Sequence, residues 1–174
     1  MRRNRHLLIV LGLLGLLLQA LPLKALAWNE GATISLPVIT KDPDDLHGFS
    51  FSLWYDPETL KWRQFNLYFD VLGAHYWVTG PSTTYHDINI LAVSPVVRYV
   101  FKEHFRVTPF LEFSIGPSYL SNTRFANRNL GMHFSFQDRG GVGILMGQRQ
   151  QFALSAHIVH YSNGSLSSNN SGPG

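Results

Sequence analysis

The sequence contains no cysteine, so no disulfide bond can stabilise the fold. It has no run of like charges, which argues against a nucleic-acid-binding surface and against a disordered charged tail. After its first 27 residues it has no apolar run long enough for a second membrane-spanning helix, and no long segment with helical periodicity. An exported domain of this composition must be held together by burial or by a closed network of hydrogen bonds.

The first 27 residues have the three parts of an export signal. Arg2, Arg3 and Arg5 form a positive start, an apolar run follows at 7–21, and Ala25-Leu26-Ala27 is a small-x-small cleavage site. The apolar run of about 15 residues is shorter than the roughly 20 that a spanning helix needs. We therefore predict a cleaved signal peptide at 1–27 and a single domain at 28–174.

Removal of this segment changes the charge balance of the chain. The segment carries four of the 14 lysines and arginines and none of the 11 acidic residues. The remainder then has ten basic and eleven acidic side chains, a net charge of −1. The basic character of the whole sequence belongs to the leader and indicates no nucleic-acid partner.

The rest of the sequence alternates between apolar and polar residues with a period of two, which is typical of β-strands. Turn-forming clusters such as Lys41–Asp45 and Gly80–Thr83 separate the alternating segments. Short turns between successive strands predict an antiparallel up-and-down sheet. We expect seven strands, at 33–38, 49–55, 63–71, 87–101, 108–119, 131–146 and 151–162.

Alternation alone does not distinguish a soluble barrel, with its apolar face inward, from a membrane barrel, with its apolar face toward lipid. Three features favour the membrane barrel. The chain has an export signal, the longer strands reach the ~9–11 residues that cross a bilayer at a tilt, and aromatic residues gather near strand ends. The expected fold is an all-β, antiparallel, up-and-down outer-membrane β-barrel.

The last predicted strand, 151–162, contains the residues that could carry chemistry. Alternate residues share a face, so His160 and Ser162 continue an apolar, lipid-directed row, while His157 points into the polar interior. A serine beside a histidine is the minimal pair for nucleophilic catalysis, and on the outer wall this pair would meet only lipid. The plainer alternative is that both are ordinary polar side chains at the headgroup interface.

Other polar residues are interpreted as structural. We expect Glu112 and Asp70 in an interior polar network, and Asp138 and Arg139 as a structural pair. The remaining histidines considered are scattered along the chain, so we place them at the membrane interface or in the interior and predict no metal site: His75, His86, His104 and His133.

The segment His160-Tyr161-Ser162-Asn163-Gly164, with Asn170 and Gly172 downstream, resembles the signature of the lipid A 3-O-deacylase family. Two upstream segments, 109–116 and 129–143, resemble the fifth and sixth strands of that family. The resemblance covers about 62–172. It implies an eight-stranded outer-membrane barrel that hydrolyses the ester-linked acyl chain at the 3-position of lipid A.

The resemblance also assigns roles within the signature. Ser162 would be the nucleophile, His160 the base, and Asn163 part of the oxyanion hole. The resemblance implies no metal and no organic cofactor. The expected partner is lipid A or lipopolysaccharide in the cell outer membrane, with no nucleic acid, and a homodimer stays open.

The sequence departs from the family pattern in two ways. The acid that completes the family's triad would fall at Gly174, and no Asp or Glu follows Asp138. The eighth strand, which should close the barrel, is missing from the seven expected here. We therefore expect the C-terminal strand to be truncated, and the 174-residue chain to be impaired in folding and in activity, because a bilayer does not tolerate an open sheet edge.

Three further functions remain open beside a lipid A esterase. The chain could be a small structural or adhesive barrel without catalysis, or an inactive truncated homologue. A lipid-binding or permeation barrel is the least favoured, because side chains fill the interior of an eight-stranded barrel.

Overall fold

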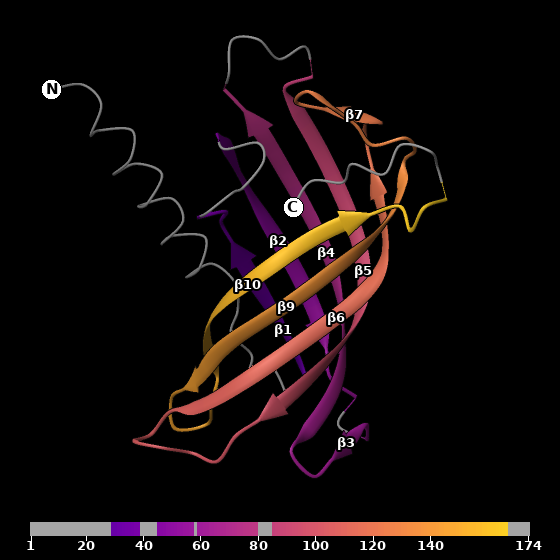
Figure 1. The fold of residues 1–174 in the computed structure, drawn as a ribbon. Coiled ribbons are helices and arrows are strands. Elements are labelled where there is room, and N and C mark those ends of the chain that lie inside the picture. Colours follow the sequence, from indigo (N-terminus) through magenta and orange to yellow (C-terminus); the bar gives the residue numbers. More distant parts are fainter. Residues whose placement is uncertain (1–28, 39–44, 58, 80–84, 167–174) are drawn as a thin grey trace, which may run out of the picture.

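The computed structural model describes residues 29–38, 45–57, 59–79 and 85–166, and the predicted signal peptide and Gly174 lie outside these residues. The described chain forms a strongly curved antiparallel sheet (Figure 1). Its seven principal strands are β1 (Glu30–Ser35), β2 (Leu46–Tyr55), β4 (Phe65–Val78), β5 (Asp87–Val100), β6 (Thr108–Leu120), β9 (Phe134–Met146) and β10 (Phe152–Ser162).

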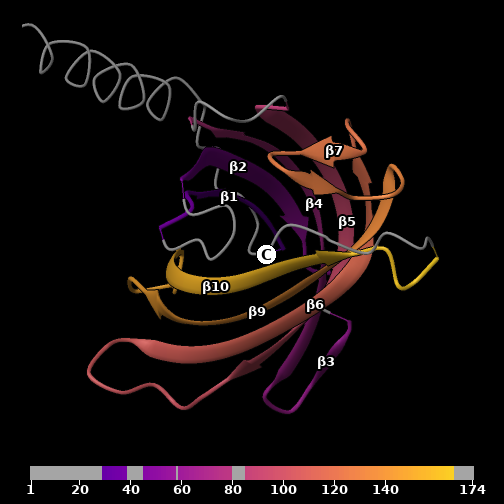
Figure 2. The same cartoon turned by 45° about the horizontal axis from the view of Figure 1, so that its top comes forward.

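The principal strands lie in chain order, β1-β2-β4-β5-β6-β9-β10, and each pairs antiparallel with the next. The sheet curls into a half-barrel, with β1 and β10 at its two edges (Figure 2). Short β3 (Lys61–Trp62) pairs with β4, and β7 (Arg124–Phe125) pairs with β8 (Arg128–Asn129) in a small hairpin between β6 and β9. The all-β, antiparallel, up-and-down fold predicted from the sequence is confirmed.

Four strands differ clearly from those expected. The first strand begins earlier and ends before Pro37, which has no N–H to donate to a ladder. The second begins at Leu46 rather than at 49. The third continues to Val78, because its pairing with β2 and β5 carries it beyond the alternating segment. The sixth begins at Phe134 rather than at Gly131, whose φ of 80° places it in a turn.

The two faces of the sheet have opposite chemistry. Along β5 and β6, inward residues are buried and the outward apolar residues are exposed. The inward face carries buried polar side chains, including Ser50, Ser52, Asp70, Ser94, Glu112, Ser114, Ser118, Gln137 and Arg139. The outward face carries exposed large apolar ones, including Phe69, Val71, Leu91, Val93, Val97, Leu111, Phe113, Ile115, Val142, Leu154 and Ile158. This arrangement, polar inside and apolar outside, is typical of membrane barrels.

Ionic contacts occupy part of the interior. Glu112 accepts hydrogen bonds from the Tyr68 hydroxyl at 2.8 Å and from Arg98 Nε at 2.9 Å, and its other oxygen lies 2.6 Å from His157 Nε2. Arg139 pairs with Asp70 from across the sheet. The interior polar network expected for Glu112 and Asp70 is confirmed. The expected Asp138–Arg139 pair was wrong, because neighbouring residues in a strand point to opposite faces.

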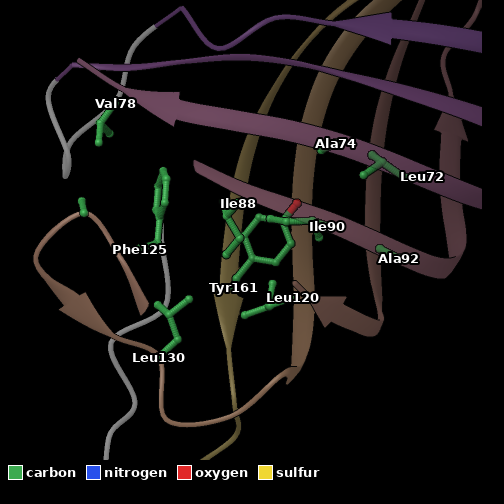
Figure 3. Packing of buried hydrophobic residues seen from close by; sticks show 11 residues of the cluster. Leu72, Ala74, Val78, Ile88, Ile90, Ala92, Leu120, Phe125, Leu130 and Tyr161 are labelled. Atoms are coloured by element: carbon green, nitrogen blue, oxygen red, sulfur yellow. The ribbon is translucent and has the colours of Figure 1, made fainter. Parts of the chain in front are cut away.

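An apolar cluster lies toward the end of the sheet where β10 finishes (Figure 3). It joins residues of β4, β5 and β6 to the β7–β8 hairpin and to Tyr161 of β10: Leu72, Ala74, Val78, Ile88, Ile90, Ala92, Leu120, Phe125, Ala126, Leu130 and Tyr161. The hairpin is thereby packed against the strand that carries the candidate site. No helix within the described residues is long and apolar enough to cross a membrane.

Candidate functional site

The candidate residues at the end of β10 lie on the faces that alternation along the strand predicts. His160 is exposed on the outer face, in the row that also contains Leu154 and Ile158. His157 turns inward, where it contacts Glu112. Ser162 is the last residue of β10 and lies half-buried at the next position of the His160 row. Two residues apart in a strand, the Cα atoms of His160 and Ser162 are about 7 Å apart on one face.

Tyr161 anchors the strand between these two residues. Its ring is buried among Ile88, Ile90 and Leu120 (Figure 3). Its hydroxyl accepts a hydrogen bond of 2.7 Å from Gln137 Nε2. Because alternate residues point to opposite faces, the inward anchor keeps both neighbours of Tyr161 turned outward.

The backbone of Ser162 is held from β9. Ser162 pairs in register with Phe136, and the Ser135 hydroxyl donates a hydrogen bond of 2.9 Å to the Ser162 carbonyl. Ser135 is itself buried. The candidate nucleophile therefore belongs to a well-supported strand end.

Asn163 begins the turn that follows. Its side chain is buried; its Oδ1 accepts a hydrogen bond of 3.0 Å from the Ser165 N–H, and its Nδ2 donates at 3.4 Å to the Leu130 carbonyl. Gly164 and Ser165 both have left-handed backbones, with φ of 61° and 65°. The side-chain amide of Asn163 thus holds the turn and links it to the β7–β8 hairpin.

The register of β6, β9 and β10 defines the outer surface around His160. Asp138 lies opposite His160 on β10 and opposite Ile115 on β6. Two residues further along β9, Gly140 lies opposite Phe113 on β6 and opposite Ile158 on β10. The outward position of Asp138 was not predicted from the sequence. The same parity rule would have found it, because Asp138 shares its face with Phe134 and Phe136.

A shallow groove starts at His160 and Asp138 and runs along the outer wall. It has a volume of about 580 Å³ and is lined by Phe113, Gly140, Val142, Ala156 and Ile158. A second hollow of about 510 Å³ shares Val142 and Ala156 with it and continues toward Ile144 and Leu154. The groove is open at Gly140, where a Cβ added to the glycine would meet nothing within 4 Å.

The other histidines do not join the site. The ring of His75 contacts Asn89 Oδ1 at 2.9 Å and packs against Trp77, and His133 stacks on Tyr119. His104 lies in the turn before β6, beside Phe105. Within the described ranges there is no group of three or more His, Cys, Asp or Glu side chains that could hold a metal ion.

The fold and the site together define a class of protein: a sheet of outer-membrane-barrel type whose apolar outer wall carries a histidine and a serine at the end of an apolar groove. The family model described as lipid A 3-O-deacylase (PagL) matches residues 47–173. This chain belongs to that family.

Named relatives agree with this assignment. The lipid A deacylase PagL of Pseudomonas aeruginosa is 34% identical over 100 residues, covering 58% of this chain and 55% of the relative. The protein of the same name from Bordetella bronchiseptica is 26% identical over 121 residues, covering 70% of this chain and 64% of the relative. The matches therefore span between about half and two thirds of these relatives.

A solved structure shares the fold. The crystal structure of the outer membrane enzyme PagL aligns with a TM-score of 0.64 and 23% sequence identity, covering 82% of this chain and 91% of that one.

Proposed function

We propose that this protein is an outer-membrane esterase that removes the ester-linked 3-O-acyl chain of lipid A. The observation that carries the proposal is the exposed position of His160 on an apolar outer wall, one step along the same row from Ser162. A polar side chain on a lipid-facing surface costs free energy, so its presence there indicates a function. A substrate that reaches this pair from outside the barrel must itself lie in the membrane.

In the proposed mechanism Ser162 is the nucleophile and His160 the general base. The Ser162 oxygen attacks the ester carbonyl while His160 accepts the hydroxyl proton. The tetrahedral intermediate then collapses, the sugar oxygen leaves with the proton from His160, and an acyl-enzyme remains. A water molecule, deprotonated by His160, releases the fatty acid and restores the serine.

Asn163 is proposed to contribute to the oxyanion hole through its backbone. Its side-chain amide is engaged with Leu130 and with Ser165, on the buried side of the turn. The N–H groups at a fixed turn are pre-placed donors of the kind that stabilise a developing oxyanion. In this proposal the side chain of Asn163 orients the turn.

The groove beside His160 is the proposed site of the acyl chain. Its lining is largely apolar, and it leads from the catalytic pair along the wall toward Leu154. From His160 to Leu154 the strand rises about 20 Å at roughly 3.3 Å per residue, which suits a long acyl chain. The sugar backbone would lie at the end of β10, beyond Ser162.

Mass spectrometry of lipid A tests the proposal. A Gram-negative host without its own deacylase would express the protein, the Ser162→Ala variant and the Ser52→Ala variant, which removes a hydroxyl on β2, away from the groove. We expect loss of one 3-O-linked acyl chain with the unchanged protein and with Ser52→Ala, and none with Ser162→Ala. An unchanged lipid A profile in cells whose membranes contain the folded protein would refute the esterase.

A non-catalytic barrel is the second candidate. It is favoured by the place of His160 and Ser162 at the end of β10, where polar side chains can reach water at the headgroup interface without any catalytic role. Measuring the protein in the outer-membrane fraction separates the candidates: inserted protein without deacylation supports the structural barrel, and inserted protein with deacylation supports the enzyme.

A further inference from the structure

The turn between β5 and β6 has an unusual sequence for its geometry. His104 and Val107 exchange two backbone hydrogen bonds, of 2.8 and 3.1 Å. The two residues between them, Phe105 and Arg106, form the loop, and both have left-handed backbones, with φ of 49° and 64°. Asn-Gly is the usual sequence of such a loop, because bulky side chains are strained at positive φ. Two large residues at these positions therefore point to a role for their side chains.

The loop holds one large apolar side chain in the open. Phe105 is 87% exposed, and its ring contacts only the edge of the turn at His104, with 4.2 Å between the ring centroids. Lys102 and Arg106, on either side of Phe105 in the sequence, are exposed and basic. An apolar ring flanked by cations suits a membrane surface, where the ring can enter the apolar boundary while the cations stay among phosphates.

The turn follows directly on an aromatic band that crosses the outer face of the sheet. Tyr99 lies 5.0 Å from Phe65 and 4.8 Å from Phe101 between ring centroids, and Trp62 of β3 stacks on Phe65 at 6.0 Å. Tyr99 shares its face of β5 with the exposed Val97. Aromatic bands of this kind lie at the membrane–water interface of barrels. The surface from which the turn projects is therefore continuous with the lipid-facing wall.

The band and the turn lie at the end of the sheet opposite the candidate site (Figure 1). β10 finishes at the site end, whereas β5 finishes and β6 begins at this one. The neighbouring turn between β3 and β4 adds the exposed Arg63, whose guanidinium lies 5.1 Å from the centre of the Trp62 ring, and Lys61. Lys61 pairs with Asp56 at 3.6 Å, and Glu103 is the acid within the β5–β6 turn.

We propose that the β5–β6 turn binds the anionic phospholipid headgroups of the leaflet opposite the candidate site. Phe105 inserts at the boundary between headgroups and acyl chains, and Lys102 and Arg106 pair with lipid phosphates. The contact fixes the depth of the barrel, and with it the level of the site, in the membrane. The choice of phospholipid rests on the proposed function, because lipid A then occupies the leaflet at the site end.

The absence of cysteine from the chain allows a single label at a chosen position. The full-length Phe105→Cys variant would carry the fluorophore NBD and be inserted into vesicles of phosphatidylcholine, with or without phosphatidylglycerol. Gln148→Cys carries the control label in the exposed turn between β9 and β10, at the same end of the sheet. The readouts are the emission maximum and the quenching by a lipid that has a nitroxide on its headgroup.

Heat-dependent gel mobility gives the folded fraction of each variant, and the fluorescence is expressed per folded molecule. Glu103→Cys supplies a second label position in the same turn if Phe105→Cys does not fold.

We expect the label at position 105 to emit at a shorter wavelength with phosphatidylglycerol than without it. Its quenching should be at least about twofold stronger, because anionic headgroups attract the two basic side chains. Lys102→Gln combined with Arg106→Gln should abolish this difference. Arg149→Gln, which removes a cation from the control turn, should retain it. Salt near 1 M should weaken the difference, since the screening length falls to about 3 Å.

Equal quenching in the two kinds of vesicle would overturn the recognition of anionic headgroups. A label at position 105 as exposed to water as the label at 148 would overturn the membrane contact altogether. A shorter emission wavelength that depends on protein density, at constant lipid composition, would identify a second copy of the chain as the occupant and also overturn the proposal. These vesicles contain no lipid A, so each outcome is separate from that of the esterase test.

Discussion

The Glu112 carboxylate contacts three polar side chains in the interior of the sheet, so removal of this carboxylate should destabilise the fold. The Glu112 side chain is 5% exposed and bonds to Tyr68, Arg98 and His157. Glu112→Ala would leave the Arg98 guanidinium without its carboxylate. Breaking a buried ion pair from one side costs about 3–5 kcal/mol, because the remaining charge stays desolvated.

The environment of Arg98 places the expected loss at the lower end of that range. Its side chain is 19% exposed, so water can reach part of it. The guanidinium also keeps its hydrogen bond to the Tyr68 hydroxyl and lies over the rings of Tyr68 and Phe110, at 4.7 and 4.4 Å. We expect a loss of about 3 kcal/mol in the free energy of unfolding.

Urea unfolding in micelles, followed by tryptophan fluorescence, measures this loss. The double variant Arg98→Met with Glu112→Ala should be more stable than Glu112→Ala alone, because no unpaired charge remains. Glu103→Gln, on the exposed turn, should stay within about 0.5 kcal/mol of the unchanged protein. A loss below about 1 kcal/mol for Glu112→Ala, or no recovery in the double variant, would refute the reasoning.

Three further predictions concern the wall and the turn. Gly141→Ala would place a Cβ 2.1 Å from the His157 ring and should lower the free energy of unfolding in urea by about 1–3 kcal/mol. Gly140→Ala, whose Cβ meets nothing within 4 Å, should leave it unchanged, and equal effects of the two substitutions would contradict this packing. Gly140→Leu should fill the groove and raise KM for long acyl chains more than for short ones in a fatty-acid release assay, and an unchanged chain-length profile would exclude the groove as the acyl site. Asn163→Ala should lose about 1–2 kcal/mol with its two turn hydrogen bonds and lower kcat by more than tenfold, and full activity would remove the turn from the mechanism.

Local alternation was sufficient to predict the architecture and the faces of the strands. The side-chain period in a strand is two, so parity alone assigns each residue to a face once one face is known to be apolar. The opposite positions of His157 and His160 on β10 follow from that rule and are confirmed. Parity was not applied to Asp138 and Arg139, which is why their predicted pairing was wrong.

Contacts between distant segments were beyond the reach of the sequence. Arg139 meets Asp70 from 69 positions away, because curvature of the sheet brings β4 and β9 to opposite sides of one interior. The pairing of Asp138 with His160 depends on the register of β9 and β10, which the length and geometry of their connecting turn decide. The sequence by itself determined an alternating chain with His160 and Ser162 on one row, since these properties are local. The tertiary structure alone decided that Asp138 lies opposite that histidine.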